Sequence, residues 1–213
     1  MCEKIIEEVR SFSEPKFAQW IKPFLSITED SKEIVFGVRV PILRKLAKKY
    51  KDIELCSLKK LLKNNIHEAR ALAVFIMILK SKTEPEMMCG LYLQNLDYIN
   101  NWDLIDYSAP HIVAPYVTEK VLRELAESDY LWANRVAMVS TIYYIKRGDY
   151  KLALELSKKF MTHEHHLMHK AAGWMLREVG KKDVEVLKKF LEKYSSKMPA
   201  VMRSYAREKI RSL

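Results

Sequence analysis

The chain has 213 residues, of which 49% are hydrophobic, so it is long enough for one large domain or two small ones with a sizeable core. A content of 5 Gly and 7 Pro argues against a loop-rich β protein and favours a mostly helical one. The net charge of +10 predicts an anionic partner, with nucleic acid ahead of an acidic membrane surface.

The cysteines and the apolar runs indicate the compartment. Cys2, Cys56 and Cys89 are far apart and match neither a disulfide framework nor a zinc site, as expected in a reducing cytosol. The amino-terminal segment carries acids where a signal peptide needs a basic start and an apolar run. The longest apolar run, Ala71 to Leu79, is far shorter than the roughly 20 residues that span a bilayer. We expect a cytoplasmic protein, nucleoid-associated in a bacterium, with no membrane partner.

Hydrophobic periodicity predicts about twelve short helices along the chain. Pro15 and Pro85 are expected in the first turns of helices, and Gly148 in a turn between two helices. The one β-like stretch, EIVFGVRVP, contains Gly37 and Pro41, so we expect a loop that leads into a helix. The expected helices are 3–11, 15–24, 40–50, 55–63, 67–80, 85–94, 101–108, 110–126, 131–146, 149–160, 166–180 and 183–211, the last with a break near 195–199.

A weak internal repeat organises the chain. Five blocks align when Arg70, Asp103, Arg135, Lys170 and Arg203 are placed in register, each block opening a helix that follows another helix. Repeated helix pairs at a period of about 33 residues are typical of α-solenoids of the HEAT-like type. We therefore expect an all-α fold: a single domain over residues 1–213, with about six antiparallel helix pairs and a concave basic groove.

Four of the five register positions carry a cation. Because equivalent positions of a solenoid line one face, Arg70, Arg135, Lys170 and Arg203 are expected to form a basic stripe on the concave surface. The alternative is that each is an ordinary solvated charge at a helix start. A cation near a helix N-terminus is mildly unfavourable against the helix dipole, which favours a further reason for these residues.

The remaining block offers an indole and a carboxylate. Trp102 and Asp106 are four residues apart and so share one helical face. Trp174 lies two blocks on, beside Gly173, which would let another group approach closely, and Arg135 lies on the intervening block. These residues are expected to converge on one concave patch. The alternative is that Trp102 fills the core and that Asp106 is a first-turn acid stabilised by the helix dipole.

The histidine run HEHHLMH, residues 163–169, invites a metal interpretation. The zinc-protease pattern H-E-x-x-H fails, because Leu167 stands where the second histidine is required. His165 and His169 share a helical face, but no third ligand is evident at motif spacing. We expect no metal site and no cofactor.

Five segments between about residue 36 and the C-terminus form a distinctive combination: FGVRVPILRKLAKKY, NWDLID, WANRVAMVS, KAAGWMLREVGKKD and KMPAVMRSYAREKI. Together they resemble the HEAT-like-repeat alkylpurine DNA glycosylases of the bacterial AlkD type. The resemblance implies excision of N3- and N7-alkylated purines from duplex DNA by a monomer. It places the two site tryptophans at Trp102 and Trp174, the aspartate at Asp106 and the arginine at Arg135.

The resemblance also implies a role for each residue. Asp106 would stabilise the oxocarbenium-like sugar, Trp102 and Trp174 would present their π faces to positive charge, and Arg135 would hold a flanking phosphate. The expected DNA-binding residues are Arg70, Arg135, Lys170, Arg177 and Arg203. The chain departs from the family at Ala200 and Ser204, where arginines are frequent. The alternatives are a non-catalytic DNA-binding solenoid and a protein-binding scaffold.

Overall fold

The computed structural model describes residues 1–28 and 30–208, and these residues form an all-α protein. Ile34 and Ile66 form an isolated β-bridge, and residues 1–28 and 30–208 contain no β-strand. The segment EIVFGVRVP is a loop, as predicted. The helices are α1 (Cys2–Ser11), α2 (Pro15–Ile21), α3 (Val40–Lys49), α4 (Leu55–Leu62), α5 (His67–Lys80), α6 (Pro85–Leu93), α7 (Trp102–Ile112), α8 (Glu119–Glu127), α9 (Leu131–Ser140), α10 (Ile142–Ile145), α11 (Lys151–Lys159), α12 (His166–Lys182), α13 (Val184–Tyr194) and α14 (Ala200–Arg207), with 3-10 turns η1 (Leu96–Tyr98) and η2 (Phe160–Thr162).

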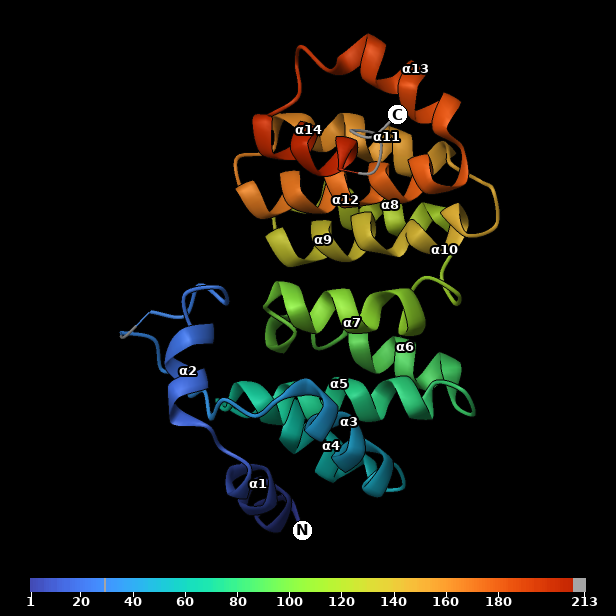
Figure 1. Ribbon diagram of the computed structural model, residues 1–213. Helices are drawn as coiled ribbons and strands as arrows, with labels where there is room; N and C mark the ends of the chain where they lie inside the picture. Colours follow the sequence, from blue (N-terminus) through green and yellow to red (C-terminus); the bar gives the residue numbers. More distant parts are fainter. Residues whose placement is uncertain (29, 209–213) are drawn as a thin grey trace. The chain divides into compact units, whose positions relative to one another are not determined.

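The chain forms two compact units, an N-terminal unit (Met1–Ile112) and a C-terminal unit (Val113–Leu213). The N-terminal unit is built around α5, whose residues from His67 to Met77 are all buried. α5 packs against α3, α4 and α7, and α1 packs on α4 and α5 (Figure 1). A helix that is apolar on nearly every side is stable only with neighbours all round, which these four provide.

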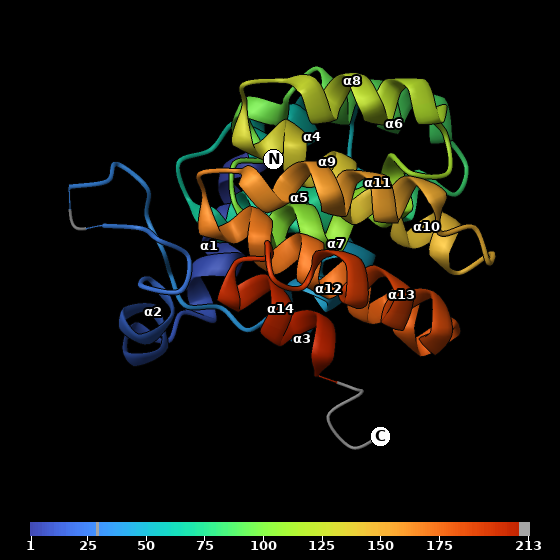
Figure 2. The same ribbon diagram turned by 90° about the horizontal axis from the view of Figure 1, so that it is seen from above.

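The C-terminal unit is built around α12, which packs against α9, α11, α13 and α14. α9, α12 and α14 lie in successive layers in Figure 1, and Figure 2 shows α14 beside α12. Each of these three helices follows another helix and opens one block of the predicted repeat. The structure therefore supports the repeat of helix pairs within this unit.

The repeat register is confirmed at the level of the helices. Arg70, Asp103, Arg135, Lys170 and Arg203 lie in the first two turns of α5, α7, α9, α12 and α14 respectively. Proline stands in the first turn of α2, α3 and α6, where its missing N–H has no partner to lose. No helix among the described residues has both the length and the apolar character needed to cross a membrane.

One expected boundary is wrong. We expected Pro110 to begin a new helix, but Pro110 lies inside α7, which continues to Ile112, and the next helix begins only at Glu119. A proline within a helix removes one backbone hydrogen bond. Here the burial of Ala109 and Ile112 on either side of it holds the turn in place. The expected range 131–146 is also divided, at Thr141, and the end of the last expected range lies outside the described residues.

Candidate functional site

The start of α7 presents Trp102 and, one turn later, Asp106, both half-buried. The side chain of Asn101 accepts a hydrogen bond from the backbone N–H of Trp102 at 2.8 Å and donates one to the Leu25 carbonyl at 2.9 Å. The indole N–H of Trp102 donates to the Phe24 carbonyl at 2.8 Å. The first turn of α7 is therefore tied to the segment after α2 at two points.

Trp102 also has a packing role. It lies against a small apolar cluster of Ala18, Leu25, Ile27 and Val35. It also lines a cavity of about 90 Å³ among α2, α3, α5 and α7. The core-filling alternative is thus correct for one part of the indole, and the hydrogen bond to Phe24 fixes its orientation.

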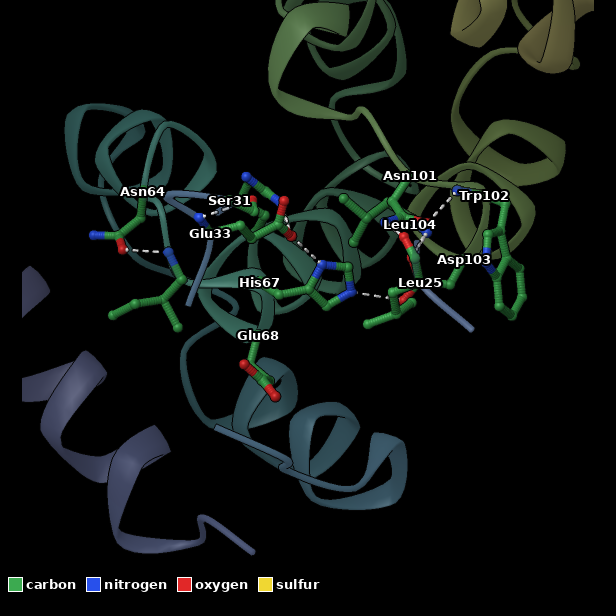
Figure 3. A network of polar contacts seen from close by, with 12 residues as sticks. Leu25, Ser31, Glu33, Asn64, His67, Glu68, Asn101, Trp102, Asp103 and Leu104 are labelled. Atoms are coloured by element: carbon green, nitrogen blue, oxygen red, sulfur yellow. Dashed lines mark hydrogen bonds and ion pairs between the residues drawn. The ribbon is translucent and has the colours of Figure 1, made fainter. Parts of the chain in front are cut away.

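The other acid at the start of α7, Asp103, contacts a buried histidine. His67, at the start of α5, is 4% exposed. Its Nε2 lies 2.8 Å from Asp103 Oδ2 and its Nδ1 lies 2.7 Å from Glu33 Oε1 (Figure 3). With a carboxylate at each nitrogen, the ring is an imidazolium that donates in both directions. The cation links α5, α7 and the loop before α3.

Burial by itself would lower the pKa of His67. The charges and hydrogen bonds of Asp103 and Glu33 outweigh burial and raise the pKa of His67 to about 10. His67 is therefore charged throughout the physiological range of pH. The carboxylate of Asp103 is neutralised by this partner, so its presence in a basic protein has a structural explanation.

Arg70, one turn after His67, is also an internal residue. It is 5% exposed and forms an ion pair with Glu33. The expectation that Arg70 belongs to an exposed basic stripe is therefore wrong, because its charge is compensated inside the N-terminal unit. A cation at this helix start is unfavourable against the helix dipole, and the ion pair with Glu33 is what stabilises it.

The loop before α3 is held by a third internal acid. Glu68 is 4% exposed and accepts hydrogen bonds from the backbone N–H groups of Phe36, Gly37 and Val38 at 2.7–3.2 Å. Gly37 has a φ of +78°, and a Cβ there would lie 2.4 Å from the carbonyl oxygen of Glu14. Glycine is required at this close approach, which keeps the loop against the start of α2.

In the C-terminal unit, Arg135 and Trp174 lie on two helices that pack together, α9 and α12. Arg135 is 4% exposed and donates to the Leu167 carbonyl at 2.8 Å, so the alternative of an ordinary solvated charge at a helix start is wrong for this residue. The indole N–H of Trp174, which is half-buried, donates to Glu178 at 3.1 Å. The convergence of these two residues with Trp102 and Asp106 stays a prediction.

The other predicted DNA-binding residues lie on α12 and α14. Lys170 is half-buried. Arg177 forms ion pairs with Glu178 and Glu208, and Arg203 donates to the Ser195 carbonyl at 2.9 Å. Their binding roles stay predictions.

Gly173 serves helix packing. A Cβ at this position would lie 2.5 Å from the carbonyl oxygen of Met202 and 2.7 Å from the Tyr205 side chain. The expected close approach at Gly173 is therefore confirmed, and the group that approaches is α14. The absence of a side chain here is what lets α12 and α14 pack directly together.

The histidine run has local structural roles. His165 caps α12, its Nδ1 accepting from the Leu167 N–H at 3.2 Å, and its own backbone N–H donates to His163 Nδ1 at 2.9 Å. His163 Nε2 lies 3.1 Å from the Asn134 side-chain oxygen. Burial lowers the pKa of both His163 and His165. Within residues 1–28 and 30–208, no three His, Cys, Asp or Glu side chains gather as a metal site would require.

Sequence reasoning missed His67, Glu33 and Glu68. The segment IHEAR places a histidine and an acid at a helix start, and an acid there is ordinary because it complements the helix dipole. His67 and Asp103 are 36 residues apart, a separation close to the repeat period. This separation could have predicted that the two residues are close together, because equivalent helix starts are neighbours in adjacent repeats.

The fold is similar to that of two solved structures. One is described as a predicted DNA alkylation repair enzyme from Enterococcus faecalis, with a TM-score of 0.71 and 14% identity over 94% of this chain and 98% of that one. The other is AlkD2 from Streptococcus mutans, with a TM-score of 0.58 and 17% identity over 92% of this chain and 98% of that one. At these identities the likeness establishes the fold.

No curated protein matches the sequence. The model of one protein family, described as DNA alkylation repair enzyme, matches residues 5–210, which is nearly the whole chain. The chain therefore belongs to the DNA alkylation repair enzyme family.

Proposed function

We propose that this protein is a DNA glycosylase that hydrolyses the N-glycosidic bond of positively charged N3- or N7-alkylated purines in duplex DNA, acting as a monomer in the cytoplasm. The observation that carries the proposal is the pairing of Trp102 and Asp106 on one face of α7. It is supported by membership of a family that repairs alkylated DNA.

The chemistry suits this pair. A purine alkylated at N3 or N7 carries a positive charge and leaves as a neutral base, so it needs little assistance from an acid. The sugar then develops oxocarbenium character, and a carboxylate near C1′ stabilises that charge and orients water. Asp106 is the carboxylate proposed for this step, and the indole of Trp102 offers a π face to the developing positive charge.

The remaining site residues supply binding in this proposal. Trp174 offers a second π face, and Arg135 holds a flanking phosphate. Lys170, Arg177 and Arg203 contribute contacts with the DNA backbone, which carry no sequence information. The net charge of +10 favours such binding.

Asp106→Asn tests the catalytic assignment. It keeps the shape of the side chain and removes the charge, so release of N7-methylguanine from duplex DNA under single-turnover conditions should slow on the order of 10²–10³-fold. Binding of undamaged duplex should persist, because the substitution removes a negative charge near DNA. Asp97→Asn, an exposed acid in η1, is the matched control and should excise at the wild-type rate. An Asp106→Asn variant with full activity would show that this carboxylate is not catalytic.

The choice of substrate tests the mechanism separately. Uracil is neutral and a poorer leaving group, so duplex DNA containing uracil should release no base. Efficient uracil release would contradict a mechanism that relies on a cationic leaving group. If neither lesion is released although duplex DNA is bound, the protein is a non-catalytic DNA-binding member of its family.

Charge reversal tests the DNA contacts. Lys170→Glu and Arg203→Glu should weaken duplex binding for all sequences alike and reduce the slope of log K against log salt. Arg70→Glu is unsuitable for this purpose, because it would replace the buried partner of Glu33 with a second carboxylate. Unchanged affinity and slope in both variants would remove these cations from the interface.

A further inference from the structure

An aromatic row runs along α2 and the turn after it, with Phe17 half-buried and Trp20 and Phe24 exposed. Phe17, Trp20 and Phe24 follow i, i+3 and i+7 spacing, so they lie on one side of the helix and the turn after it. The ring centroids of Phe17 and Trp20 are 5.6 Å apart and those of Trp20 and Phe24 are 4.8 Å apart. Trp20 is 59% exposed and Phe24 56% exposed. We call these three residues the aromatic row.

The fold of the N-terminal unit does not explain this exposure. α2 already buries its opposite side through Ala18, and Ile21 packs against the same buried cluster. Both Figure 1 and Figure 2 show α2 at the edge of the N-terminal unit. Neighbouring large aromatic side chains left in water mark a surface for a partner, since each ring would gain by burial.

The charges around the row favour a nucleic acid. The guanidinium of Arg39 lies 3.7 Å from the Phe17 ring centroid, and Lys16 on α2 is exposed. Glu14, the acid at the start of α2, pairs with Arg39 at 3.0 Å, so these two charges offset each other and Lys16 supplies the net positive charge there. Aromatic faces combined with flanking cations match a strand whose phosphates meet the cations while a base stacks on a ring.

The row leads directly to the proposed catalytic segment. The carbonyl of Phe24 accepts the indole N–H of Trp102 at 2.8 Å, and the carbonyl of Leu25 accepts from Asn101 at 2.9 Å. A nucleotide on Phe24 would therefore lie beside the start of α7, within the same unit.

We propose that the aromatic row binds an unpaired base of DNA by stacking, next to the lesion site. A base inside a duplex is covered on both faces by its neighbours, whereas an unpaired base presents a face that an exposed ring can stack on. DNA as the source of that base rests on the proposed function. The surface itself rests on the exposure of the rings and on their cations.

Binding of undamaged oligonucleotides by the full chain tests this role. Fluorescence anisotropy compares a fully paired duplex with the same duplex carrying a single unpaired thymine. Trp20→Ala and Phe24→Ala should each weaken binding of the bulged duplex about tenfold, in line with loss of one stacking contact, while leaving the paired duplex unchanged. Trp20→Phe should retain most of the affinity and Trp20→Leu should not, because only the former keeps a π face.

Met87→Ala on α6 is the matched control, since Met87 is a 48% exposed apolar residue of the same unit. It should bind both duplexes as the wild type does. Unchanged affinity in Trp20→Ala for the bulged duplex would overturn the proposal, and so would equal losses on both duplexes. Loss of self-association in Trp20→Ala with DNA binding intact would identify a protein contact instead and would equally overturn it.

The outcomes for the two proposals are separable. No damaged base is needed in the binding assay, so Asp106→Asn should bind the bulged duplex normally even where excision is lost. A failed stacking test leaves the catalytic assignment of Asp106 standing, and a failed excision test leaves the stacking surface standing.

Discussion

The buried imidazolium of His67 joins two helices and a loop of the N-terminal unit, so its removal should have a large effect that depends on pH. Burial alone would lower the pKa of His67, but Asp103 and Glu33 raise it to about 10 from an ordinary 6.5. One unit of pKa shift corresponds to about 1.4 kcal/mol. The charged ring therefore contributes on the order of 5 kcal/mol to the free energy of unfolding.

The direction of the pH effect follows from the sign of the shift. The folded-state pKa lies above the unfolded-state value, so the contribution is complete below about pH 6.5. It declines by about 1.4 kcal/mol per pH unit as pH rises and is lost above about pH 10. His67→Gln removes the charge at every pH and leaves two carboxylates facing a neutral group. The loss should be about 3–5 kcal/mol at pH 6 and fall below about 1 kcal/mol at pH 10.

Urea unfolding followed by tryptophan fluorescence measures this difference. Trp20 and Trp102 lie in the N-terminal unit, and Trp132 and Trp174 in the C-terminal unit. Trp132 and Trp174 are replaced by phenylalanine both in the protein with His67 and in the His67→Gln variant. The remaining tryptophan fluorescence then reports the N-terminal unit. The free energy of unfolding is then compared between pH 6 and pH 10.

The matched control is His166→Gln, which alters an exposed histidine of the C-terminal unit and is measured in the chain that keeps all four tryptophans. It should change stability little, and by the same amount at both pH values. If the deficit of His67→Gln were the same at pH 6 and pH 10, the ring would not be a cation between two carboxylates. The reasoning above would then be refuted.

Five further substitutions test the packing and capping of the helices and the partner of His67, by urea or thermal unfolding unless another method is named. Gly173→Ala should cost about 1–3 kcal/mol, because the added Cβ would lie 2.5 Å from a backbone oxygen of α14. Gly90→Ala, with nothing within 4 Å, should stabilise α6 by up to about 1 kcal/mol, and equal effects of the two would contradict the packing. Asp183→Ala should cost about 1 kcal/mol, since its side chain accepts two backbone N–H groups at the start of α13, and Asp183→Asn should recover most of that loss. Asp103→Asn should cost stability at pH 7 and bring the titration of His67, followed by NMR, closer to its ordinary range. An unmoved titration would exclude Asp103 as the partner.

The helices could be predicted largely because their signals are local. Proline in the first turn predicts the starts of α2 and α6, and the periodicity of apolar residues predicts most of the other helices. The end of α7 could not be predicted in the same way. Pro110 is a local stop signal, but α7 continues past it because Ile112 is fully buried in the unit. Tertiary burial outweighs one lost hydrogen bond there.

In the candidate site, too, the features set by local spacing could be predicted and those set by tertiary packing could not. Trp102 and Asp106 share a face of one helix, so their spacing alone places them together. The burial of Arg70 and Arg135 could not be predicted, because the repeat register identifies equivalent positions without saying which side chains find a partner. Glu33, the partner of Arg70, lies in a loop before the first repeat block and has no place in the register.

The two acids of the WDLID segment can now be distinguished. Asp103 stands where the other repeat blocks carry a cation, and it faces His67 at the start of α5. Because inner helices of adjacent repeats are neighbours, charges of opposite sign at successive helix starts attract each other across the packing of α5 on α7. The acid at the cationic position is thus accounted for by structure. We therefore assign to Asp103 the task of holding the first turn of α7 in place, whereas the oxocarbenium chemistry proposed for Asp106, one turn further along the same helix, rests on its spacing from Trp102.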